Sequence, residues 1–73
     1  MVRRSTFINN IRELGYEYKT LQKRTLLYRK TGGTHFISVP RTEWLEDEYV
    51  RSVLRQAGIS EPEIQSFLAS AKS

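Results

Sequence analysis

The residues most able to do chemistry gather around the one histidine of the chain. In the stretch LQKRTLLYRKTGGTHFISVP, residues 21 to 40, two apolar-basic runs flank a glycine pair, and His35 follows directly. Cleavage of RNA without a metal needs a base for the 2′-hydroxyl and usually an acid for the leaving oxygen. Histidine suits both tasks because its ordinary pKa is about 6.5. His35 is therefore the only histidine candidate for such a reaction.

Basic and aromatic residues occupy the same part of the chain. The lysines and arginines can hold phosphates and stabilise charge in a phosphoryl transition state. Tyr16, Tyr18 and Tyr28 can stack on bases or can form part of the core, because a small sheet also buries one aromatic face. The candidate phosphate-binding cations are Lys19, Lys23, Arg24, Arg29 and Lys30.

The net charge of +4 is divided unevenly between two halves of the chain. Residues 1 to 42 carry nine lysines and arginines and two glutamates, which gives +7, whereas residues 43 to 73 carry −3. A basic half beside an acidic half favours a polyanionic partner on one face, although ordinary solvated surface explains the same pattern.

Length and composition limit the class of protein. A chain of 73 residues forms one domain, here residues 1–73, and 38% hydrophobic residues suit a globular fold. There is no cysteine for a disulfide or a thiolate metal site, and we expect no cofactor. The acids Glu46, Asp47 and Glu48 resemble a metal cluster, but the favourable charge at a helix N-terminus explains them better. No apolar stretch could span a membrane and no secretory signal follows the first residues, which predicts a cytoplasmic protein.

Hydrophobic periodicity predicts an α+β fold of order α-β-β-β-α with a short C-terminal helix. A helix is expected over residues 5 to 14, capped by Ser5 or Thr6, and strands are expected over residues 16 to 22, 24 to 30 and 35 to 39. Further helices follow over residues 46 to 57 and after Ser60, and the connector should tuck Trp44 and Leu45 against the sheet. Two helices would cover one face of a three-stranded antiparallel sheet, which leaves the other face for a ligand. This order is that of double-stranded-RNA-binding domains.

Three segments resemble a known family in their residues and in their order along the chain. Residues 51 to 60, RSVLRQAGIS, resemble the closing helix motif of the HicA toxins, which are small bacterial mRNA interferases. Residues 13 to 17, ELGYE, and residues 37 to 40, ISVP, resemble that family's first helix–strand junction and third strand. The resemblance implies a double-stranded-RNA-binding-like fold, metal-independent cleavage of mRNA, and a HicB-type antitoxin partner.

The chain departs from the family at the catalytic position. The family has a Gly-Ser-x-His segment at the start of its second strand, where this chain reads Arg24-Thr25-Leu26-Leu27. Thr25 corresponds to the serine and joins the candidate RNA-binding residues, but the histidine has no counterpart. The family also often has a histidine after Val-Pro, where this chain has Arg41 and Thr42.

His35 should lie far from the family's catalytic position. His35 opens the third strand, at the end of the sheet opposite the start of the second strand. The two positions are about five residues apart along the strand direction, which corresponds to roughly 16 Å. His35 either defines a relocated site, or packs on Tyr28, or faces water.

Three functions stay open: a HicA-like endoribonuclease, a non-catalytic RNA- or DNA-binding relative, and a module that docks an acidic protein.

Overall fold

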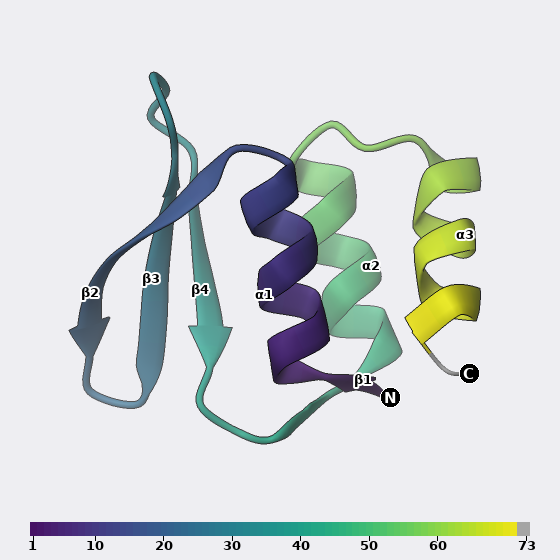
Figure 1. Cartoon of the computed structure of the whole chain (residues 1–73), viewed down its shortest axis with the longest axis horizontal. Coiled ribbons are helices and arrows are strands. Elements are labelled where there is room, and N and C mark those ends of the chain that lie inside the picture. Colours follow the sequence, from purple (N-terminus) through teal and green to yellow (C-terminus); the bar gives the residue numbers. More distant parts are fainter. Residues whose placement is uncertain (72–73) are drawn as a thin grey trace.

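A three-stranded antiparallel sheet with three helices on one side of it makes up the computed structural model, which describes residues 1–71 (Figure 1). Within these residues no helix is long and apolar enough to cross a membrane. The α+β prediction is confirmed. The elements are β1 (Val2–Arg3), α1 (Arg4–Glu13), β2 (Tyr16–Gln22), β3 (Thr25–Lys30), β4 (Phe36–Pro40), β5 (Trp44–Leu45), α2 (Asp47–Gln56) and α3 (Glu61–Ala71).

The main sheet has the order β2-β3-β4, so that β3 is its central strand. Tyr28 of β3 pairs with Tyr18 on one side and with Ile37 on the other. Directly opposed residues share a face of the sheet, and side chains alternate along each strand. Ile37 is accordingly buried on the helix side of the sheet, while Phe36 is exposed on the outer side.

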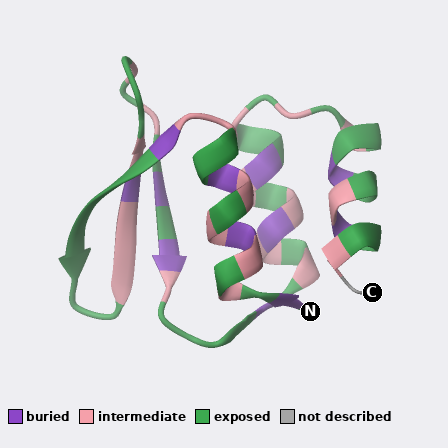
Figure 2. Cartoon of the chain, in the orientation of Figure 1, coloured by how far each residue is buried: buried purple, intermediate pink, exposed green. Residues whose placement is uncertain are grey.

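The core lies between the sheet and the helices. Figure 2 shows buried residues where the helices face one another and on β3 and β4, whereas β2 is exposed beyond its first residue. Tyr49 of α2 donates a hydrogen bond to the carbonyl of Ser38 on β4, and burial raises the pKa of Tyr49 to about 12. The buried residues are Val2, Phe7, Ile11, Tyr16, Tyr28, Ile37, Val39, Leu45, Val50, Leu54, Ile64 and Leu68.

The start of α1 differs from the prediction. The helix begins at Arg4, and neither Ser5 nor Thr6 caps it; Arg3 is the N-cap residue and makes no side-chain cap bond. The reason is a two-residue ladder in which β1 pairs with β5, with Val2 opposite Leu45. The amide of Arg4 then donates to the carbonyl of Glu43 at 2.8 Å. The segment before β5 therefore satisfies a helix N-terminal amide that a capping side chain would otherwise bond.

The same two-residue ladder determines which side chains of the connector before α2 are buried. Leu45 is buried as predicted, but Trp44 is 43% exposed and does not tuck against the sheet. Side chains alternate along a strand, so that only one of two consecutive residues can face the core. The guanidinium of Arg3 lies 4.4 Å from the centre of the Trp44 ring and covers part of it.

Glycine and an acidic residue together set the position of α3. Gly58 adopts a φ of +86°, and Ile59 donates to the carbonyl of Leu54 at 3.0 Å, which closes α2 in a Schellman motif. Glu61, the first residue of α3, then accepts from Arg55 at 3.1 Å and also bonds Arg51. The bond from Arg55 and the charges of both arginines hold the pKa of Glu61 below its ordinary value.

We expect Glu61→Gln to lower the melting temperature at neutral pH and to matter less in acid. Because the pKa of Glu61 is lowered on folding, its contribution is present above the ordinary value of 4.5 and is lost as the pH falls through the folded value. Melting curves of both proteins between pH 7 and pH 3 should therefore converge in the acidic range. A difference that stays constant across this range would contradict the assignment.

Candidate nucleic-acid interface

One end of the sheet brings together two segments that are distant in sequence. Gln22 pairs with Thr25, which leaves Lys23 and Arg24 as a two-residue turn between β2 and β3. Thr25 also pairs with Pro40, and the amide of Arg41 donates to the carbonyl of Arg24 at 3.1 Å. The turn therefore lies beside the segment that leaves β4. We call residues 23–25 and 40–42 together the tip site.

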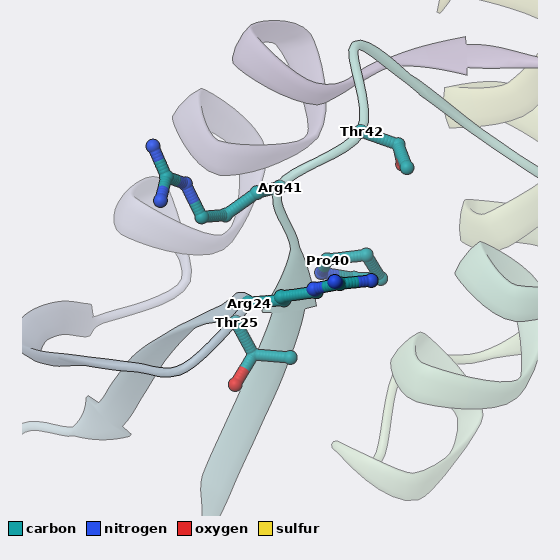
Figure 3. A pocket seen from close by; sticks show the side chains of 5 residues that line it. All are labelled: Arg24, Thr25, Pro40, Arg41 and Thr42. Carbon is teal, nitrogen blue, oxygen red and sulfur yellow. The ribbon is translucent and has the colours of Figure 1, made fainter.

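The tip site is hollowed and carries cations. An open hollow of about 540 Å³ is lined by Arg24, Thr25, Pro40, Arg41 and Thr42, and a second hollow adjoins it at residues 22–25. In Figure 3 the side chain of Arg24 lies along Pro40, whereas Arg41 extends away from it on the side of α1. The hollow is thus lined by two arginines, of which Arg24 lies along it and Arg41 points toward α1.

Lys23 has a backbone conformation that lysine seldom adopts. Its φ is +49°, in the left-handed region, and it is the one residue other than glycine with positive φ in residues 1–71. This conformation costs an L-residue about 1–2 kcal/mol, and glycine or asparagine is the usual choice. A lysine at this point keeps a positive charge at the tip of the hairpin at the expense of some stability.

The cations of the tip site are among those that form no ion pair. Arg3 pairs with Glu43, Lys19 with Glu17 at 3.6 Å, and both Arg51 and Arg55 with Glu61. The remaining lysines and arginines within residues 1–71 form no ion pair, and all of them precede Thr42 in the chain. They are Arg4, Arg12, Lys23, Arg24, Arg29, Lys30 and Arg41.

The residues predicted to bind RNA do not form one group. Lys23, Arg24 and Thr25 meet at the tip site, and the hydroxyl of Thr25 donates to the carbonyl of Gln22 at 3.1 Å. Lys30 lies at the opposite end of β3, where its ammonium donates to the carbonyl of Leu14 and sits 5.4 Å from the centre of the Tyr16 ring.

The other two predicted cations also lie away from the tip. Lys19 forms a β-bulge on the edge strand, between Tyr18 and Thr20, where the register shifts. Arg29 pairs with Phe36 on the outer face of the sheet, and its Nε is covered without a hydrogen-bond partner within residues 1–71.

His35 lies at the end of the sheet opposite the tip site. The carbonyl of His35 accepts from the amide of Lys30, whereas Thr25 at the tip pairs with Pro40. His35 and the tip site are therefore separated by the five positions of β3 between Thr25 and Lys30, or roughly 16 Å. The Nδ1 of His35 lies 2.6 Å from the hydroxyl of Tyr16, and the two rings meet edge to face. The aromatic partner of His35 is thus Tyr16 and not Tyr28, because the side chain of His35 lies over the start of β2.

Sequence reasoning missed three contributors to this end of the molecule. Arg41 and Thr42 line the hollow directly, and the guanidinium of Arg4 donates to the carbonyl of Arg41. Arg41 and Thr42 occupy the positions after Val-Pro, where a family histidine was sought and not found. Their place directly after Val-Pro is a signal by which the sequence could have identified Arg41 and Thr42. No sequence pattern places Arg4, at the start of α1, beside them.

The chemistry available at the tip site is that of anion binding. Guanidinium and ammonium groups donate hydrogen bonds to phosphate but do not readily accept a proton near neutral pH, and the hydroxyls of Thr25 and Thr42 already donate to backbone carbonyls. Among residues 1–71 no three acidic or histidine side chains come together as a metal site.

No protein-family model, no curated protein sequence and no solved structure matches this chain.

We expect Lys23→Gly to fold at least as stably as the natural protein. Glycine adopts the left-handed conformation without strain, which offsets its greater freedom in the unfolded chain. Lys23→Val should instead lose about 1 kcal/mol or more of unfolding free energy, because a branched side chain tolerates positive φ poorly. Urea unfolding of the three proteins measures the difference. Equal stabilities for glycine and valine would show that the turn imposes no such requirement.

Proposed function

We propose that this protein binds RNA through the tip site, as a HicA-like protein that lacks the catalytic histidine of that family. The observation that carries the proposal is that Lys23 and Arg24 line one hollow and Arg24 and Arg41 line the adjoining one, and none of the three forms an ion pair within residues 1–71. Like charges placed together repel one another, and a polyanion removes that repulsion. The phosphates of RNA supply such a partner and release counterions when they bind.

The fold is compatible with the proposed family. The α-β-β-β-α order and the single helix-covered face of the sheet are those expected for a double-stranded-RNA-binding-like domain. In a HicA-like protein the ligand would be mRNA and a HicB-type antitoxin would be the protein partner. The small ladder of β1 with β5 adds to this order without changing it.

The tip site supports binding better than cleavage. In the resemblance the family histidine corresponds to Leu27, whose side chain cannot serve as a general base. His35 would need to act across the length of the sheet, and its Nδ1 is engaged by Tyr16. Cleavage at the tip would therefore depend on charge stabilisation alone.

A second candidate function is cleavage at a relocated site around His35. The hydroxyl of Tyr16 orients the imidazole, in the way a third group orients the base of a catalytic pair, and Lys30 lies beside the same tyrosine. This arrangement offers a base and a cation within one cluster. It lacks the hollow and the free arginines that distinguish the tip.

RNA binding by Lys23→Gly combined with Arg24→Ala tests the tip site. Loss of two phosphate contacts on single-stranded RNA should reduce the slope of log K against log salt by about 1.4 and weaken binding at every salt concentration. Fluorescence anisotropy of a labelled single strand between 50 and 200 mM salt, about the range over which such contacts titrate, measures both. The turn should stay folded because glycine suits position 23.

The matched control removes two charges elsewhere. Arg3→Gln with Arg55→Gln produces the same change in net charge, but both arginines are exposed and ion-paired away from the tip. This variant should keep the slope of the natural protein. An equal loss in both double variants would mean that net charge alone, and not the tip site, governs binding.

Incubation with a long single-stranded RNA under metal chelation tests the cleavage alternative. We expect the natural protein and His35→Ala to leave the RNA intact while both bind it. Cleavage by the natural protein that disappears in His35→Ala would assign catalysis to the cluster of His35, Tyr16 and Lys30. Cleavage by both would require a histidine-free mechanism, which the tip variants would then locate.

A further inference from the structure

Strand β2 turns the side chains of Tyr18 and Leu21 toward the helix side of the sheet, where residues 1–71 leave them about half exposed. Tyr18 pairs with the buried Tyr28, and its ring meets that of Tyr28 edge to face at 5.8 Å. Leu21 pairs with Leu26, which packs against the core from the same face. Even so, Tyr18 is 52% exposed and Leu21 is 47% exposed. In Figure 1 β2 forms the edge of the sheet farthest from α2 and α3.

The bulge at Lys19 creates this pair. Residues 18 and 21 are three positions apart, and in a regular strand they would point to opposite faces. The register shift between Tyr18 and Thr20 inserts one residue, so that both Tyr18 and Leu21 point to the helix side. Bulges commonly re-aim side chains in this way, and this one turns Leu21 to the face on which Tyr18 already lies.

Helix α1 carries two arginines that form no ion pair among residues 1–71. Arg4 and Arg12 lie eight positions apart, which puts them on one side of the helix with Ile8 between them. Burial raises the pKa of Tyr28 and the positive charges of Arg12 and Arg4 lower it, and the ring of Tyr28 meets that of Tyr18. Arg4 also bonds the carbonyl of Arg41, so this surface is continuous with the tip site.

We infer that Tyr18, with Arg4 and Arg12, binds an unpaired nucleotide of the RNA held at the tip. The ring of Tyr18 can stack on a base, Leu21 extends the apolar contact, and the two arginines can receive the adjoining phosphates. A base inside a duplex has both faces covered by its neighbours and cannot stack on a side chain, whereas an unpaired base can. The surface therefore selects single-stranded RNA, whereas the cations of the tip accept either form. This inference rests on the proposed function.

The test compares a single-stranded RNA with a duplex of the same length by fluorescence anisotropy. Tyr18→Ala should lose about fivefold or more in affinity for the single strand and should bind the duplex unchanged. Tyr18→Phe keeps the ring and should bind both as the natural protein does. Phe36→Ala is the matched control, because Phe36 is 49% exposed on the opposite face of the sheet, and it should leave both affinities unchanged.

Arg12→Gln provides a second variant that does not alter the sheet. It should lower the affinity for the single strand and reduce its salt slope by about 0.7, which is one phosphate contact. Unchanged single-strand binding by Tyr18→Ala and Arg12→Gln, with loss in the tip variant, would overturn this inference and leave the proposed function standing. Failure of the natural protein to bind either RNA would overturn both.

Discussion

The register of the central strand β3 is the constraint on which the rest of the structure depends. Thr25 pairs at once with Gln22 and with Pro40, and this double pairing sets the hairpin turn beside the segment that leaves β4. The same register puts Tyr28 and Ile37 into the core. A slip of one residue would turn the apolar side chains to the outer face. The same register is therefore required both to bury the core and to assemble the tip site.

The charges that stabilise this small domain differ from those that we propose to bind RNA. The arginines of α2 are paired with Glu61 and fix α3 against α2, while Arg3 is paired with Glu43 beside the β1–β5 ladder. The cations of the tip have no such partner, and one of them occupies a left-handed backbone position. A fold selected for stability alone would favour glycine and a carboxylate at these places. Their absence from the tip is consistent with a ligand that supplies the negative charge.

The sequence predicts the main elements because their signals are local. Alternation of apolar residues identifies the three long strands, and glycine after an apolar helical stripe marks the ends of the first two helices. The β1–β5 ladder escapes prediction because two residues cannot show a period. The exposure of Trp44 and the missing cap of α1 follow from that ladder, so one unrecognised pairing accounts for both errors.

The candidate site is predictable only in part. The turn cations could be named from the sequence, because a basic hairpin tip is a local feature. Arg41, Arg4 and Arg12 could not be grouped with them, since only the three-dimensional packing brings α1 and the end of β4 beside the hairpin. The orientation of Leu21, on the same face as Tyr18, also depends on a bulge that alternation does not reveal.

The central claim is that RNA binds at the tip of the sheet. A titration of the isotope-labelled protein with single-stranded RNA, followed by the chemical shifts of its backbone amides, locates the ligand without any substitution. The account predicts the largest changes at residues 22–25, 41 and 42, with the amides of α3 unmoved. Changes centred on α2 and α3, or on Tyr16 and His35, would contradict it.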